Sequence, residues 1–268
     1  MKKRLTLIFL SILCFLSIFT LNVKKVEAKD NFSTTPYTTQ IIGIGGELVN
    51  SSTAYEGVYV FNPGLSTPSD IFIDDNDIVY IADKGNGRVL VYNHETKETK
   101  EIGKGVLAGP TGVFVSKSDE IFVADETNKL VYIFNQNGEK LLEINRPDAK
   151  KEPLFGAINE ETGESTVSYV PTKVAVDSAD NIYITSQGNG NGIIQMKLNR
   201  DDNGVFDSEK PYEFLGYFGP NPINKTMAEQ FQELFYTKEQ KKLYGKKPTP
   251  PYNVTIDDRN TVYSVTQE

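Results

Sequence analysis

The chain has 268 residues and a formal net charge of −8 at pH 7, and 38% of its residues are hydrophobic. This length and apolar content allow a substantial core in one or two domains. The acidity argues against binding to nucleic acid, which rests largely on neutralising phosphates, and against anionic membrane surfaces.

Residues 1–28 have the pattern of a secretory signal peptide. A basic start, Lys2 to Arg4, precedes an uncharged and mostly apolar run from Leu5 to Leu21, and small residues end at Ala28. We expect cleavage after Ala28 and a secreted, extracytoplasmic protein that is peripheral to the membrane at most. The alternative is an N-terminal membrane anchor, since the run reaches the lower end of the roughly 17–25 residues that span a bilayer.

The only cysteine, Cys14, lies inside this apolar run. The cleaved chain therefore has no cysteine and forms no disulfide. Secretion without disulfides is more typical of a bacterial envelope than of a eukaryotic secretory product. The segment that follows is a polar lead-in, for which the sequence predicts strands over Tyr37–Ile42 and Gly57–Phe61 around a glycine-rich turn.

One motif occurs four times without a gap, beginning at Pro68, Pro110, Pro171 and Pro251. Each copy has a short β-branched run after the proline, a turn rich in Asp, Asn or Ser, and a second apolar run. Period-two alternation around such a turn predicts strand, turn, strand. In the first two copies two more strands are predicted, at Arg88–Tyr92 and from Lys100 to Ile102, and then at Leu130–Phe134 and Lys140–Ile144.

Repetition at this spacing indicates a repeat architecture, and four short antiparallel strands per unit must stack radially to bury enough apolar surface. The order of proline, strands, Gly-Asn turn and Asn-Gly turn resembles the NHL repeat from Pro68 to Glu268. The resemblance implies an all-β fold, a six-bladed type of β-propeller with four-stranded blades. It says little about activity, because propellers host unrelated functions.

Two insertions interrupt the repeat. Residues 145–168 are polar, and a short strand is expected at Ser165–Tyr169. Residues 222–247 hold a predicted helical insertion, because Thr226 and Glu229 form a capping box and apolar residues follow at helical spacing. We interpret this insertion as a cap packed on a blade, with a lid or partner-docking element as the alternative.

The fourth copy reaches its second strand and stops at Glu268. Residues 29–268 thus form an incomplete propeller, because closed propellers typically have four to eight blades. We expect a fragment of a longer protein, and the alternative is a natural truncation closed by another chain.

Metal and catalytic chemistry find little support in the motifs. In lactonases of the gluconolactonase type, which resemble these repeats, Asn or Asp follows the proline, and Glu lies two residues before it in one blade. The residues directly after the proline here are Ser69, Thr111, Thr172 and Tyr252. Those two positions before it are Ser66, Ala108, Tyr169 and Thr249, so neither position matches the lactonase pattern. The single histidine, His94, lies in a charged turn, unsuited to a zinc site or a catalytic triad. We expect no catalytic residue, no metal and no cofactor in this chain.

Two carboxylates resemble an acidic catalytic pair. Asp83 and Asp125 occupy one repeat position, which is Ser186 and Thr266 in the other copies. All four side chains can bond local backbone at a strand end, so we interpret them as turn caps. Residues 201–207 have alternating carboxylates but lack the last glutamate of an EF-hand, which favours a solvated turn over a calcium loop.

The mouth of the channel is the candidate binding site. In a propeller the innermost strand begins at the repeat's proline, so the residues just after it should ring one end: Asp70, Thr111, Thr172, Lys173, Tyr252 and Asn253. Their mixed polar groups suit a polar ligand, and would equally suit a water-filled channel. We predict a binding or scaffolding module for a glycan or protein at the cell envelope. The alternative is a hydrolase or lactonase whose catalytic residues lie mainly in blades absent from this chain.

Overall fold

The computed structural model describes residues 40–50, 60–163, 165–219, 235–237 and 249–266. They belong to two compact units, Met1–Pro63 and Gly64–Glu268. The predicted signal segment, residues 1–28, lies outside the described residues. In the described part of the chain, no helix has the length and apolar character to cross a membrane.

The first unit contains a β-hairpin. Strand β1 (Gln40–Ile42) pairs antiparallel with β2 (Leu48–Asn50). The second strand predicted for this region, Gly57–Phe61, is wrong at Val60 and Phe61, which lie in no strand, and residues 57–59 are outside the described part. The chain reverses earlier because the Gly43 amide donates to the Glu47 carbonyl over 2.8 Å, and Gly46 adopts a φ of 84°.

The second unit consists of consecutive antiparallel sheets, in which each strand pairs with its neighbour in sequence. We call them blades 1 to 4; in blade 4 the described residues form two strands. Blade 1 contains β3 (Pro68–Ile73), β4 (Ile78–Asp83), β5 (Arg88–Asn93) and β6 (Thr99–Ile102). Blade 2 contains β7 (Pro110–Val115), β8 (Ile121–Asp125), β9 (Leu130–Phe134) and β10 (Lys140–Ile144). Blade 3 contains β11 (Pro171–Val176), β12 (Asn181–Ser186), β13 (Ile193–Leu198) and β14 (Tyr212–Phe218). Blade 4 contains β15 (Pro251–Ile256) and β16 (Val262–Thr266).

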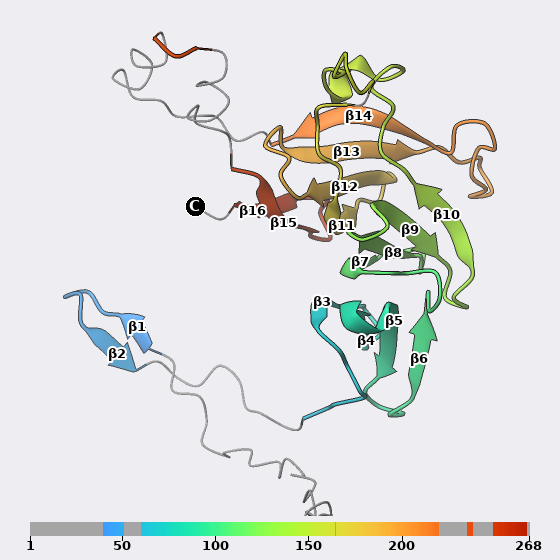
Figure 1. Cartoon of the computed structure of the whole chain (residues 1–268). Coiled ribbons are helices and arrows are strands. Elements are labelled where there is room, and N and C mark those ends of the chain that lie inside the picture. The colour runs from blue at the N-terminus through green and yellow to red at the C-terminus, as the bar shows by residue number, and fades with distance from the viewer. Residues whose placement is uncertain (1–39, 51–59, 164, 220–234, 238–248, 267–268) are drawn as a thin grey trace, which may run out of the picture. The chain divides into compact units, whose positions relative to one another are not determined.

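The first strands of the four blades lie together. Strand β7 contacts both β3 and β11, and β11 contacts β15, so the sheets follow one another around these inner strands (Figure 1). This arrangement of four-stranded blades confirms the predicted all-β, β-propeller fold class. Two short 3-10 helices, η1 (Lys84–Asn86) and η2 (Pro153–Phe155), lie in connections.

The hydrophobic core lies between the blades. In β8, Ile121 and Val123 pack in the cluster shared with blade 1, whereas Phe122 and Ala124 pack in the cluster shared with blade 3. Successive side chains of a strand point to opposite faces, so a blade covered on both sides needs apolar residues at every position. All five residues of β8 are accordingly buried.

A common turn joins the first and second strands of every blade. It contains one Asp or Asn with positive φ, a conformation that these residues tolerate best after glycine: Asp77 (58°), Asp119 (61°), Asp180 (62°) and Asn260 (60°). In blade 1 the Oδ1 atom of Asp74 accepts hydrogen bonds from the Asn76 and Ile78 amides, each over 2.9 Å. The polar turns predicted between the paired apolar runs therefore have a defined hydrogen-bonded form.

The insertion at 145–168 differs from its prediction. Ser165 forms an isolated bridge with Ile158 and no strand runs over Ser165–Tyr169. Two buried side chains, Phe155 and Tyr169, tie the loop to the core instead, and the Tyr169 hydroxyl donates to the Ile144 carbonyl over 3.3 Å. The predicted helical insertion at 222–247 lies outside the described residues apart from 235–237, which are turn and coil.

Candidate functional site at the inner ends of the blades

A cavity of about 650 Å³ opens beside the starts of the inner strands. Its walls come from blades 1 to 4, so only the assembled blades create it. The lining residues are Ser69, Thr111, Glu126, Thr172, Lys173, Gln187, Gly188, Thr249, Pro250, Pro251, Tyr252 and Asn253. Five of the six residues predicted from the sequence line this one cavity, and Asp70 reaches it through an ion pair.

A β-bulge at the start of each inner strand determines how these side chains point. The pairing register shifts just after Pro68, Pro110, Pro171 and Pro251. A bulge adds one unpaired residue and redirects the side chains around it. The residue after the proline can therefore bond to backbone at the blade-to-blade junction instead of following the regular alternation.

Hydroxyl groups at this position join neighbouring blades. The Ser69 hydroxyl lies 2.8 Å from the Pro110 carbonyl of blade 2, and the Thr111 hydroxyl 3.3 Å from the Pro171 carbonyl of blade 3. The Thr172 hydroxyl bonds within its own blade, 2.9 Å from the Thr185 hydroxyl. Thr111 is buried, and the part of Thr172 that lines the cavity already has hydrogen-bond partners. The Thr111 hydroxyl thus serves a blade junction, and the Thr172 hydroxyl serves the pairing within blade 3.

The next residue along brings blades 1 and 3 into direct contact. Lys173 Nζ lies 2.7 Å from Asp70 Oδ1 and donates to the Ser69 carbonyl over 3.1 Å. The other carboxylate oxygen of Asp70 accepts the Val113 amide of blade 2 over 3.0 Å. One Lys–Asp pair therefore links three blades at the inner end.

Gly112 makes this crossing possible. A Cβ atom there would lie 2.7 Å from the Thr172 carbonyl oxygen and 2.8 Å from the Lys173 Cα atom. Such contacts are shorter than packed atoms adopt, so the blade 3 backbone can pass this closely only over a glycine. Gly112 occupies in blade 2 the repeat position that Asp70 occupies in blade 1 and Lys173 in blade 3.

Blade 4 presents different groups. Tyr252 is 65% exposed, and Asn253 is also exposed. Asn253 Oδ1 accepts the Val254 amide over 2.8 Å, and its Nδ2 group has no partner among the described residues. Both side chains are exposed and line the cavity.

Sequence reasoning missed Glu126 and Gln187 in this wall. Both follow the second strand of their blade directly, at the repeat position that Lys84 occupies in blade 1. The repeat alignment contains this position, but only the structure shows that it borders the mouth. Glu126 forms an ion pair with Lys84 across the blade 1 to blade 2 junction.

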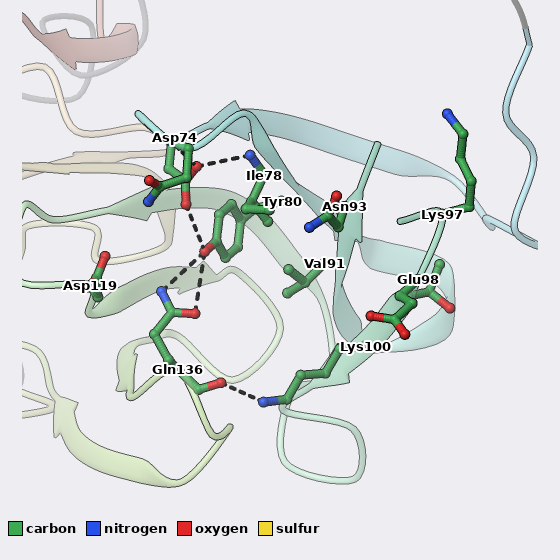
Figure 2. Close-up of a pocket in the computed structure, with 12 residues that line it drawn as sticks. Asp74, Ile78, Tyr80, Val91, Asn93, Lys97, Glu98, Lys100, Asp119 and Gln136 are labelled. Carbon is green, nitrogen blue, oxygen red and sulfur yellow. Dashed lines mark hydrogen bonds between the residues drawn. The ribbon is translucent and has the colours of Figure 1, made fainter. Parts of the chain in front are cut away.

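A second cavity, of about 870 Å³, lies at the turn ends of blades 1 and 2. Figure 2 shows Tyr80 pointing toward Asp74 and Gln136 in this cavity. The Tyr80 hydroxyl lies 3.2 Å from Asp74 Oδ2 and 3.1 Å from Gln136 Nε2. Burial raises the pKa of Tyr80 to about 12, so its phenol is neutral at physiological pH and acts as a hydrogen-bond donor.

The Tyr80–Asp74 contact recurs in other blades, which argues for a structural role. Tyr183 contacts Asp177 over 3.2 Å, and Tyr263 contacts Asp257 over 2.9 Å. In blade 2 both partners change together, to Phe122 and Ser116. A phenol without its acceptor would be a poorly satisfied polar group, so the joint replacement has a simple physical reason. This contact supports blades 1, 3 and 4 and is not specific to one site.

The two suspected catalytic carboxylates are structural caps, as predicted. Asp125 is fully buried, and its two oxygens accept the amides of Ala108, Gly109, Thr127 and Asn128. Asp83 is also fully buried and accepts the Ser66 amide over 2.7 Å and Arg88 Nε over 2.8 Å. Each carboxylate ties the loop before its blade to the end of the second strand.

Asp83 provides a pH-dependent contribution to stability. Burial opposes ionisation, but hydrogen bonds from Asn86, Ser66 and Arg88 outweigh it and lower the pKa of this carboxyl. Its stabilising effect is therefore complete above the unfolded value of about 3.9 and disappears as the pH falls through the depressed folded value. We expect Asp83→Asn to lower the free energy of unfolding by about 1–3 kcal/mol at pH 7 and by less near pH 3.

Urea unfolding at the two pH values measures this difference, and the exposed carboxylate variant Asp258→Asn provides the control. An equal loss at both pH values would show that the Asp83 charge does not matter. The loss of stability would then come from the changed packing and hydrogen bonds at this position and not from the lost charge.

Among the described residues, no three His, Cys, Asp or Glu side chains gather where they could hold a metal ion. Residues 201–207 form a turn, in which Asp201 Oδ1 accepts the Asn203 and Val205 amides over 2.9 and 2.8 Å. The expected absence of metal, cofactor and catalytic residues stays a prediction for the chain as a whole.

The blades and their inner cavity define a β-propeller repeat protein, and the comparisons add a partial family match. The model of a β-propeller repeat, SBBP, matches residues 161–194, which include β11 and β12. No curated protein matches the chain.

Several solved structures are similar at low identity. Virginiamycin B lyase from Staphylococcus aureus is 11% identical with a TM-score of 0.44, covering 87% of this chain and 57% of that one. A gluconolactonase from Xanthomonas campestris is 12% identical with a TM-score of 0.43, covering 85% and 61%. A protein of unknown function from Bacteroides thetaiotaomicron is 15% identical with a TM-score of 0.43, covering 85% and 47%. The chain spans less than two thirds of the length of each, and likeness at this level does not identify an activity.

Proposed function

We propose that this protein is a binding module whose site is the cavity at the inner ends of its blades. The observation that carries the proposal is the convergence of residues from four repeats on one cavity of about 650 Å³. Concave sites lined by a few converging polar groups are the usual form of ligand sites. The described lining contains hydroxyl, amide, aromatic and paired charged groups, a set that suits recognition of a polar ligand.

The described groups of the cavity are arranged for binding more than for chemistry. The cation Lys173 is held by Asp70, and the hydroxyls of Thr111 and Thr172 are engaged with backbone or side-chain oxygens. A nucleophile or general base needs a free lone pair positioned by a partner. The exposed Tyr252 and Asn253 offer contact area and hydrogen bonds without such a pairing.

The proposal includes the setting of the protein. The blade motif supports an NHL type of propeller, and the N-terminal pattern of residues 1–28 supports secretion to the envelope or exterior. A ligand there would be a glycan or an envelope protein. The net charge of −8 makes nucleic acid and anionic membrane surfaces poor partners.

Binding by the full chain recovered from a secreting host tests this function. Arrays of immobilised glycans and envelope proteins serve as probes, and Asn253→Ala should weaken the retained interaction several-fold because it removes an exposed amide donor from the cavity. Thr255→Ala is the matched control, since Thr255 is exposed on the same strand but does not line the cavity.

Two results would contradict the proposal. Binding that is equally strong in Asn253→Ala and in the control would place the interaction elsewhere. Calcium-dependent hydrolysis of a sugar lactone, lost on chelation, would favour the enzyme alternative.

A further inference from the structure

Tyr252 departs from the structural pattern of its own repeat position. The other three copies have a hydroxyl residue after the proline, Ser69, Thr111 or Thr172, and each hydroxyl lies within 3.3 Å of a carbonyl oxygen of its own blade. Blade 4 replaces this group with a large aromatic ring that is 65% exposed. Its hydroxyl has no such bond within the described residues, so the ring does not repeat the structural role of the other three side chains.

The position of this ring suggests what it contacts. Tyr252 lines the same cavity as Lys173 and Gln187, beside the stiff Pro250–Pro251 segment. An exposed ring on a rigid wall offers a flat apolar face together with a polar edge. Sugar rings present such a combination, with C–H groups on one face and hydroxyls around the rim.

We propose that Tyr252 is the stacking platform for a sugar ring and that the cavity selects a neutral glycan. This inference rests on the proposed function and specifies its ligand class. The exposed side chains of Tyr252, Asn253 and Gln187 then form the sugar-binding surface.

The charges of the cavity favour an uncharged ligand. Its two charged lining residues are both neutralised by partners: Lys173 by Asp70, and Glu126 by Lys84. The described lining thus has no uncompensated charge to attract a carboxylate, a phosphate or a basic side chain. An ionic ligand would have to break one of these pairs, and a neutral one would not.

The amide groups match the hydroxyls of a sugar. A side-chain amide carries both a donor and an acceptor, so it can bond two neighbouring hydroxyls at once. The Gln187 side chain has no hydrogen-bond partner among the described residues, and Asn253 keeps its Nδ2 donors after its oxygen accepts the Val254 amide. Lys173 uses two of its three donors on Asp70 and Ser69, which leaves one for a hydroxyl oxygen.

The test compares Tyr252→Ala, Tyr252→Phe and Val265→Ala with the unchanged full chain. The probes are neutral oligosaccharides (cellohexaose, chitohexaose, maltohexaose and mannohexaose), anionic polygalacturonate, and a peptide set from digested envelope proteins. Val265 is the control because it lies in the same sheet as Tyr252, is 61% exposed and does not line the cavity. Circular dichroism verifies that every variant keeps its β-structure.

We expect one neutral oligosaccharide to bind, with affinity falling about ten-fold or more in Tyr252→Ala. Tyr252→Phe should stay within about two-fold, because the ring is retained, and Val265→Ala should bind as the unchanged protein does. The bound oligosaccharide should also quench or shift the tyrosine fluorescence of the unchanged protein. The change should be smaller in Tyr252→Phe, with each protein compared with its own unbound state.

The contrary outcomes distinguish a failure of this inference from a failure of the proposed binding function. Glycan binding that is unchanged in Tyr252→Ala but weakened in Asn253→Ala overturns the platform and leaves the binding site. Binding of polygalacturonate alone or of peptides alone overturns the neutral-glycan class while a binding function remains. Failure of every probe to bind overturns both.

Discussion

Replacing Asp125 by alanine should destabilise the protein by about 3 kcal/mol or more, because four backbone amides, that of Gly109 buried, would lose the fully buried carboxylate that accepts their hydrogen bonds. The carboxylate is fully buried and accepts hydrogen bonds from Ala108, Gly109, Thr127 and Asn128. An alanine side chain can accept none of these bonds and leaves a space too confined for bulk water. The free energy of unfolding in urea measures the loss.

Two further variants make this result interpretable. Asp125→Ser should lose less, since Ser186 fills the same position in blade 3 and accepts the Val170 amide over 2.8 Å. Asp258→Ala should change little, because Asp258 is exposed and pairs only with the exposed Lys117. If Asp125→Ala lost no more than Asp258→Ala, the carboxylate would not hold the loop before blade 2.

The second large effect is expected at Gly112. Gly112→Val should lower the free energy of unfolding by about 3 kcal/mol or prevent folding, and Gly112→Ala should cost about 1–3 kcal/mol. The added atoms would meet the Thr172 carbonyl and the Lys173 Cα atom at less than 3 Å. Both neighbours are backbone atoms of an adjacent blade, so no side-chain rotation can relieve the contact.

The same substitution should disturb the site. Displacement of blade 3 would separate Lys173 from Asp70, which are now 2.7 Å apart, and ligand affinity should fall along with stability. Thr255→Val is the control, because it places a valine at an exposed position of an inner strand while exchanging only a hydroxyl for a methyl group. A Gly112→Ala protein as stable as the unchanged one would mean that the blades do not approach this closely.

Much of the fold could be predicted because it depends on local patterns. Strands β3, β7, β11 and β15 begin at the four prolines of the repeat, and their partners follow the polar turns. The strand predicted at Ser165–Tyr169 failed because no neighbouring strand pairs with it; the loop is anchored by Phe155 and Tyr169 instead. Alternation predicts a strand, but a strand also needs a partner.

The candidate site was predicted only in outline. The residues after each proline were placed at one mouth, and five of the six line one cavity. Their roles differ in ways that the sequence does not express: Thr111 joins two blades, whereas Tyr252 is exposed. Glu126 and Gln187 were missed because their repeat position looks like an ordinary strand end.

The sequence by itself determined the repeat, its strands and its turns, because period-two alternation, proline and Asx residues act over a few neighbouring positions. It also determined that Asp83 and Asp125 are equivalent and therefore a poor catalytic pair. The tertiary structure alone decided that Lys173 reaches Asp70, since the two residues belong to different blades and meet only where Gly112 admits the backbone between them. It also decided which copies of the repeated position serve the architecture and which copy, Tyr252, is exposed.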